Sequence, residues 1–103
     1  MIATSKNKIL GVYAAARVIV QRYGHTKKFA KHIVALVIKE QKKLSDEELA
    51  EFVAVNPIGR VLGYKRKPNA STFSKVRSRS DLRIFEELYY WLVQNAMKGR
   101  RLS

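Results

Sequence analysis

A basic stretch in the second half of the chain has the residue types that hold nucleic-acid phosphates. Residues 53–79 contain seven lysines and arginines and no aspartate or glutamate. Three of these cations form the run 65–67, followed by Pro68, which disfavours helix at the residue before it. Lysine and arginine neutralise phosphates and so supply much of the affinity of proteins for DNA. We therefore expect a phosphate-contacting loop made by Lys65, Arg66 and Lys67.

A short helix is predicted directly after this loop, over residues 70–79. Phe73 and Val76 are its only large apolar residues and lie three positions apart, so we expect them to dock the helix on a core. Its hydroxyl and basic side chains could donate to phosphates and to base edges such as the acceptors of guanine. A solvated loop and an ordinary surface helix would give the same pattern. The candidate DNA-binding residues are Lys65, Arg66, Lys67, Asn69, Ser71, Thr72, Lys75, Arg77 and Arg79.

A second group of cations lies at the start of a predicted helix over residues 26–42. Positive charge at a helix N-terminus opposes the helix dipole, which favours an anionic partner there. His25 and His32 are seven positions apart and could lie on one face of this helix, but no cysteine or nearby carboxylate completes a metal-ligand set. We expect no metal site. We expect a secondary phosphate-binding strip, with a solvated face as the alternative, made by Lys27, Lys28 and Lys31.

The sequence has no residue pattern typical of catalysis or cofactor binding. It contains no cysteine, which excludes disulfides, cysteine-based zinc sites and cysteine catalysis. No Ser-His-Asp arrangement and no glycine-rich phosphate loop is present. Four acidic residues lie near the start of one predicted helix, namely Asp46, Glu47, Glu48 and Glu51. Helix capping explains this cluster better than metal binding does. The expectation is a protein that is not an enzyme and that needs no cofactor.

Helical periodicity runs through the chain and predicts an all-α fold. The β-branched run 33–38 leaves a strand open as an alternative at that place. We expect one compact domain of five to six helices over residues 1–103, with an N-terminal helix pair (1–43) and a helix-turn-helix-like core with a C-terminal helix (44–103). The helices are expected over residues 6–23, 26–42, from 45 to about 55, 57–62, 70–79 and from 82 onward.

Local signals set several of these boundaries. Ser45 and Glu48 have the spacing of a capping box, and Asn56 followed by Pro57 is typical of a helix start. Thr26 is the expected cap of the second helix. The expected buried face of the last helix consists of Leu82, Phe85, Leu88, Tyr89, Leu92 and Ala96.

The net charge of +13 on 103 residues indicates a polyanionic partner. The chain is 47% hydrophobic, which is enough for a folded core. Nucleic acid is the commonest partner of such a protein, and an anionic membrane surface is the other candidate. Because the longest apolar run, 33–38, is far too short to span a bilayer, we expect no membrane partner. The expected location is the cytoplasm, in association with the nucleoid.

Several pieces of the second half of the chain occur in a recognisable order. They are Leu44-Ser-Asp-Glu-Glu-Leu49, Asn56-Pro57 through Val61-Leu62-Gly63, Ser71-Thr-Phe-Ser-Lys-Val-Arg77 with Arg79, Phe85-Glu-Glu-Leu88 and Met97-Lys-Gly99. In this order they resemble the N-terminal helical region of DDE-type insertion-sequence transposases. The resemblance covers roughly residues 30–103. It places Lys75, Arg77 and Arg79 in a basic motif, although Arg77 lies nearer the docking side of its helix, where Glu86 is its expected partner.

The resemblance carries implications for function. In that family the helical region precedes a ribonuclease-H-like catalytic domain and is taken to help bind the terminal repeats of the element. The first catalytic aspartate would follow a helix like the one that Gly99 closes, so a chain that stops at Ser103 lacks the metal-binding Asp-Asp-Glu triad. The resemblance thus implies a truncated, isolated or domesticated transposase region that binds double-stranded DNA and does not cut it.

Two other functions fit the same sequence features. Charge and size suit an RNA-binding or ribosome-associated protein equally well. A helical dimerisation or interaction module is the third possibility, formed by the first two predicted helices with their apolar stripe and by exposed aromatics. Three consecutive aromatic residues, 89–91, cannot all face the core of one helix. We expect these aromatics in a core or an interface rather than in base stacking. A homodimer would also be compatible with DNA binding, since paired half-sites multiply affinity.

Overall fold

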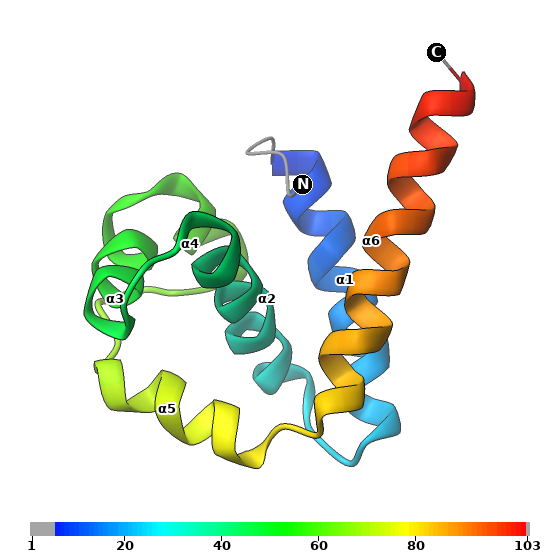
Figure 1. Ribbon diagram of the computed structural model, residues 1–103. Coiled ribbons are helices and arrows are strands. Elements are labelled where there is room, and N and C mark those ends of the chain that lie inside the picture. Colours follow the sequence, from blue (N-terminus) through cyan, green and yellow to red (C-terminus); the bar gives the residue numbers. More distant parts are fainter. Residues whose placement is uncertain (1–5, 103) are drawn as a thin grey trace.

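The described part of the chain consists of helices and the loops that join them. A computed structural model describes residues 6–102, and it describes side chains for residues 8–95. Within these residues there is no strand. The six helices are α1 (Lys6–Arg22), α2 (Lys27–Lys42), α3 (Asp46–Val55), α4 (Pro57–Leu62), α5 (Ala70–Arg79) and α6 (Leu82–Leu102) (Figure 1). The all-α fold and the expected number of helices are confirmed.

The helix α2 passes through the middle of the molecule. Every residue from Ile33 to Ile38 is buried, and α2 packs against α1, α3 and α5. A helix that is covered on most sides has no polar stripe in its middle, which explains why the apolar run is unbroken. The strand alternative for residues 33–38 is therefore wrong. The lysines near the start of α2 lie where the helix emerges from this core.

Capping interactions begin α3 and α4 where the sequence predicts them. Ser45 Oγ accepts a hydrogen bond from the Glu48 N–H at 3.1 Å, and Glu48 Oε1 accepts one from the Ser45 N–H at 2.8 Å, which completes the capping box. Asn56 Oδ1 accepts from the Ile58 N–H at 3.0 Å at the start of α4. Thr26 occupies the N-cap position of α2, but its side chain makes no capping hydrogen bond.

The backbones of α3 and α4 meet at Gly59. A Cβ atom at this position would lie 1.7 Å from the carbonyl oxygen of Val53, far inside van der Waals contact. Glycine is therefore needed for this close approach. The turn between these two helices is the single residue Asn56, whereas residues 63–69 separate α4 from α5. The helix-turn-helix-like character of this region stays a prediction.

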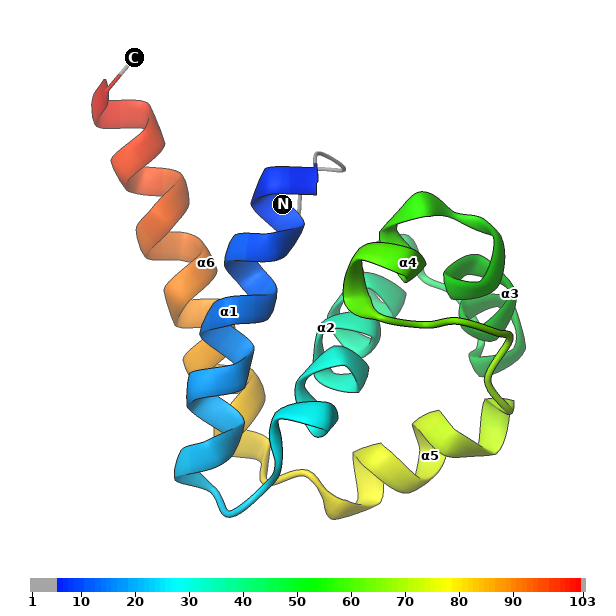
Figure 2. The same cartoon turned by 180° about the vertical axis from the view of Figure 1, so that it is seen from behind.

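The helices α1 and α6 lie side by side, and α5 crosses one end of the molecule to reach α6 (Figures 1 and 2). The buried stripe of α6 is formed by Ile84, Leu88 and Leu92 at four-residue spacing. Burial of Leu88 and Leu92 was expected and is confirmed. Leu82 is 69% exposed, so its expected burial is wrong; two positions before Ile84, it points away from the stripe. Ala96 lies outside the described side chains.

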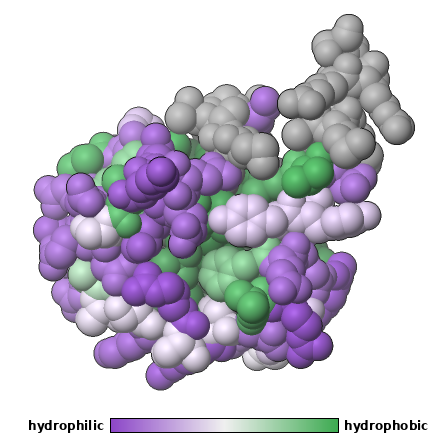
Figure 3. Space-filling model, viewed as in Figure 1, coloured by the Kyte–Doolittle hydropathy of each residue, from purple (hydrophilic) through white to green (hydrophobic). Residues whose placement is uncertain are grey.

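One cluster of buried side chains draws on all six helices. Phe73 and Val76 bring α5 into it, as the sequence predicts. Hydrophilic residues cover much of the side of the molecule formed by α3, α4 and α5 (Figure 3). The core therefore fixes the relative positions of α2 and α5, which carry most of the candidate residues.

Candidate nucleic-acid interface

The segment 63–69 crosses from α4 to α5 (Figure 2). Two adjoining hollows lie between this segment, α2 and α5. The first, about 300 Å³, is lined by α2 and α5, and the second, about 650 Å³, is lined by α2, the segment 63–69 and the start of α5. Both are lined by His32 and Thr72, so they form one concave surface, here named the basic hollow. Its polar and charged lining residues are Thr26, Lys28, Lys31, His32, Tyr64, Lys65, Arg66, Lys67, Asn69, Thr72, Lys75 and Arg79.

The charged residues that line the basic hollow are all cations. They come from α2 (Lys28, Lys31), from the segment 63–69 (Lys65, Arg66, Lys67) and from α5 (Lys75, Arg79), and no aspartate or glutamate is among the lining residues. Charges of one sign in a concave surface with low-dielectric walls reinforce one another's potential. The basic hollow is therefore a place where an anion would be strongly attracted.

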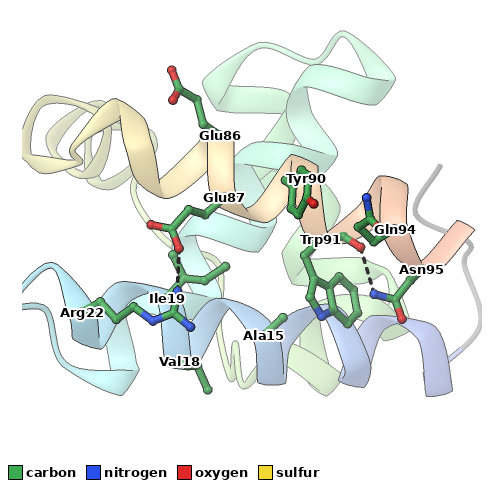
Figure 4. A pocket seen from close by; sticks show the side chains of 10 residues that line it. All are labelled: Ala15, Val18, Ile19, Arg22, Glu86, Glu87, Tyr90, Trp91, Gln94 and Asn95. Atoms are coloured by element: carbon green, nitrogen blue, oxygen red, sulfur yellow. Dashed lines mark hydrogen bonds and ion pairs between the residues drawn. The ribbon is translucent and has the colours of Figure 1, made fainter.

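The hollow between α1 and α6 has a different character (Figure 4). Arg22 of α1 lies 2.6 Å from Glu87 of α6, and the same carboxylate accepts a hydrogen bond from Tyr23. Glu86 also lines this hollow, together with Tyr90, which is 68% exposed. Because carboxylates offset the arginine here, this surface does not concentrate positive charge.

Most of the predicted DNA-binding residues meet in the basic hollow, including members of both predicted groups. From the main group these are Lys65, Arg66, Lys67, Asn69, Thr72, Lys75 and Arg79, and from the secondary strip Lys28 and Lys31. Ser71 and Lys27 are exposed but do not line the hollow. The structure thus joins two groups that the sequence could treat only as separate strips.

Arg77 lies on the α3 side of α5 and not in the basic hollow. Its two terminal N–H groups donate to the two oxygens of Asp46, each at 2.7 Å, and Ser74 Oγ donates to the same carboxylate at 3.1 Å. The hydrogen bonds from Arg77 lower the pKa of Asp46 to about 2, and those to Asp46 raise the pKa of Arg77. The expected Arg77–Glu86 pair is wrong, because α5 docks with Arg77 facing the first turn of α3.

Lys67 has a carboxylate partner within the described residues. Its Nζ lies 2.9 Å from Glu51 Oε2 on α3, and this hydrogen bond raises the pKa of Lys67. A phosphate would have to compete with Glu51 for the ammonium group. Within the described side chains no ion pair is made by the other six cations of the hollow, Lys28, Lys31, Lys65, Arg66, Lys75 and Arg79.

The start of α5 leaves polar groups available next to the hollow. Asn69 occupies the N-cap position, and its carbonyl oxygen accepts from the Thr72 N–H at 3.0 Å. The Asn69 side chain makes no capping hydrogen bond, so its amide is not committed to the helix. Together with the hydroxyl group of Thr72, this amide gives the hollow hydrogen-bonding groups besides its cations.

His32 is a candidate functional residue that the sequence analysis considered only as a metal ligand. Its Nδ1 lies 2.7 Å from the hydroxyl oxygen of Tyr64, which is 32 positions away in the sequence. Burial lowers the pKa of His32 to about 4, and the charge of Lys31 lowers it as well. The ring is therefore neutral at pH 7. A contact across this sequence distance leaves no local pattern that could have indicated it.

His25 lies outside α2. It precedes the N-cap residue Thr26 and stacks on Phe29, with 4.0 Å between the ring centroids. The two histidines therefore do not share a helix face. In the described part of the chain, no three His, Asp or Glu side chains gather where they could hold a metal ion. Likewise, none of the described helices combines the length and apolar character needed to cross a bilayer.

Comparisons of the chain with protein-family models, with curated proteins and with solved structures gave no match. The resemblance to the transposase region therefore rests on the sequence pieces alone.

Proposed function

We propose that this chain binds double-stranded DNA without cleaving it, and that the basic hollow and α5 are its contact surface. The observation that carries the proposal is the convergence of cations from α2, the segment 63–69 and α5 on one concave surface lined by no carboxylate. Like charges gathered in this way repel one another and destabilise the folded chain. A polyanion relieves that repulsion, and the DNA releases counterions when its phosphates are neutralised.

The dimensions of α5 suit entry into the major groove. Its ten residues span about 15 Å at 1.5 Å per residue, and the major groove of B-DNA, about 12 Å wide, admits one α-helix. In this arrangement Lys75 and Arg79 reach base acceptors such as those of guanine. Lys65 and Arg66, on the segment that leads into α5, contact the flanking phosphates.

Binding to the ends of a mobile element is the finer form of the proposal. The basic motif of the transposase resemblance coincides with α5, and two of its cations, Lys75 and Arg79, line the basic hollow. A transposase-derived region with this surface would occupy terminal repeats in nucleoid DNA without performing strand transfer. This form of the proposal needs a sequence preference, whereas charge alone would give nonspecific binding.

Selection of binding sites from a random duplex library, at about 0.15 M salt with excess nonspecific competitor, tests the proposal. A recovered motif supports a sequence-reading role for α5, and the symmetry of the motif reports whether a monomer or a dimer binds. Strong binding without a motif would contradict that role. Stronger competition by structured RNA than by duplex DNA would contradict the choice of DNA.

Two single substitutions separate base reading from phosphate contact. Arg79→Ala should cost on the order of 1–3 kcal/mol on the selected site and much less on other sequences. Lys65→Ala should weaken binding to all sequences alike. Both side chains are exposed, so the fold should persist, which circular dichroism checks. An equal loss on all sequences for both variants would rule out base reading by α5.

A further inference from the structure

His32 lies where the two parts of the basic hollow meet, because it lines both of them. It belongs to the second turn of α2 and lines both parts, as Thr72 of α5 does from the opposite side. The charged groups that share these linings with it are all cations: Lys28 and Lys31 on α2, Lys65, Arg66 and Lys67 on the segment 63–69, and Lys75 and Arg79 on α5. A neutral imidazole is thus surrounded by positive charge.

Tyr64 fixes the orientation of the His32 ring. The hydroxyl oxygen of Tyr64 lies 2.7 Å from Nδ1. The imidazole also meets the rings of Tyr64 and Phe73 edge-on, with 5.6 and 6.1 Å between the ring centroids. Both aromatic side chains are buried, so the imidazole has little room to turn.

The same hydroxyl group decides which ring nitrogen carries the proton. A buried hydroxyl hydrogen needs an acceptor, and His32 Nδ1 is the acceptor that the structure gives it. If Nδ1 were protonated, the hydroxyl hydrogen of Tyr64 would have no acceptor among the described side chains. Since the imidazole is neutral at pH 7, its single proton lies on Nε2.

Nε2 of His32 faces the hollow. Among the described residues, no buried side-chain nitrogen or oxygen lacks a hydrogen-bond partner, and His32 makes its hydrogen bond through Nδ1. Nε2 therefore reaches solvent, and the hollow is the solvent space that His32 lines. No carboxylate lines that space to accept from Nε2–H, whereas an anion placed there would accept from it.

We propose that His32 is a phosphate ligand, whose Nε2–H donates to a phosphodiester oxygen of DNA seated in the basic hollow, and that Tyr64 is a positioning residue that holds the ring by donating to Nδ1. The inference rests on the proposed DNA binding and assigns one phosphate to a defined place. Thr72 offers a second donor from the other wall, and the surrounding cations neutralise the phosphate. A lysine attracts phosphates by charge, but a ring held by Tyr64 fixes where one of them lies.

Nitrogen-15 NMR of the imidazole groups in the full chain tests the inference directly. In the free protein, the His32 signals should be those of a neutral ring protonated on Nε2. Addition of a duplex of about 16 base pairs should move the Nε2 and Hε1 signals of His32, because a charge-assisted hydrogen bond forms there. Inorganic phosphate is added separately at the same concentration of phosphate groups. It would shift the His32 signals if the site binds anions in general, and it would leave them in place if the site needs the DNA backbone.

Three substitutions give an independent readout in DNA-binding assays. His32→Phe keeps the ring but removes both nitrogens, and it should lower the affinity for duplex DNA about tenfold or more. His32→Gln can place an amide N–H where Nε2 lies, so it should recover most of that loss. Tyr64→Phe keeps the packing but frees the tautomer, and it should give an intermediate loss with a changed Nε2 signal in the free protein. The signals of the wild-type chain keep the inference testable should His32→Phe fail to fold.

The outcomes separate the inference from the proposed function. If the wild-type chain binds duplex DNA while the His32 signals stay in place and His32→Phe binds equally well, His32 is an ordinary packed residue and the inference is overturned. If His32→Gln fails to recover the affinity that His32→Phe loses, the donor role is overturned. If the wild-type chain binds no duplex at all, the proposed function fails and the inference fails with it.

Discussion

Replacing Lys65 and Arg66 with glutamine should reduce the salt dependence of DNA binding by a calculable amount. Four of the cations of the basic hollow that make no ion pair within the described side chains are the proposed phosphate contacts, namely Lys28, Lys31, Lys65 and Arg66. If each neutralises one phosphate, the slope of log K against log salt is about −0.9 per phosphate, or about −3.6. Removing two of the four changes the slope to about −1.8. The two substitutions are conservative in size, and both side chains are exposed.

The same arithmetic gives the loss of affinity. We take the association constants of the variant and the wild type for DNA to be equal near 1 M salt. A slope difference of about 1.8 then corresponds to a loss of affinity of about sixtyfold at 0.1 M salt and about ninefold at 0.3 M. Fluorescence anisotropy of a labelled duplex, measured across about 0.05–0.3 M NaCl, resolves both the slope and the gap. The gap should therefore close as salt is raised.

A matched control removes the same charge elsewhere. Lys42→Gln combined with Lys43→Gln changes the other end of α2, and Lys42 lies about 16 Å along the helix axis from Lys31, the nearest cation of the hollow on this helix. This distance is more than one and a half Debye lengths at about 0.1–0.15 M salt, so the control should keep the wild-type slope within experimental error. An unchanged slope for the Lys65 and Arg66 variant, or an equal loss for the control, would refute the assignment of the basic hollow as the contact surface.

Three further predictions follow from particular contacts. Gly59→Ala should destabilise the fold by about 1–3 kcal/mol or more in urea unfolding, because the added Cβ would clash with the α3 backbone. Gly11→Ala is the control and should be neutral or stabilising, because its Cβ would lie 3.7 Å from a ring atom of Trp91, an ordinary contact. Arg77→Gln should lower the free energy of unfolding at pH 7 by about 1 kcal/mol or less, since Asp46 is part-exposed. The pKa of Asp46 is lowered in the folded state, so its stabilisation is present above pH 4 and disappears as pH falls towards 2, and unfolding curves of Arg77→Gln and wild type should converge there. Lys67→Ala should weaken DNA binding less than an alanine substitution of an unpaired cation of the hollow does, because Lys67 must leave Glu51 to bind phosphate. An equal loss would show that breaking the Lys67–Glu51 ion pair costs no free energy.

Features set by neighbouring residues could be predicted from the sequence. The capping box of Ser45 and Glu48 spans four residues, and the cap by Asn56 spans three, so each is visible in a short window. The same holds for the docking of α5, since Phe73 and Val76 stand alone among polar residues. The orientation of α6 could be predicted only in part. Helical spacing connects Leu88 either to Ile84 or to Phe85, and the sequence alone does not decide which of these positions continues the buried face.

The composition of the site depended on contacts that no short window contains. The exposure of the run 65–67 and of the cations of α5 could be predicted, because charged side chains almost always lie at the protein surface. That Lys28 and Lys31 join them depends on how the core places α2 beside α5. The partner of Arg77 depends on which turn of α3 faces α5, and the pairing of His32 with Tyr64 joins residues 32 positions apart. The sequence thus indicated the chemistry of the surface but not its arrangement.

Amide chemical-shift mapping with a short duplex tests the central claim most directly. Titration of the isotope-labelled full chain at about 0.15 M salt, where charge attraction is moderate, should shift signals in three places. These are the start of α2, the segment 63–69 and α5, while the signals of the hollow between α1 and α6 should stay in place. Shifts concentrated on α1 and α6, or an absence of shifts at DNA concentrations that saturate a binding assay, would contradict the basic hollow as the DNA-binding surface.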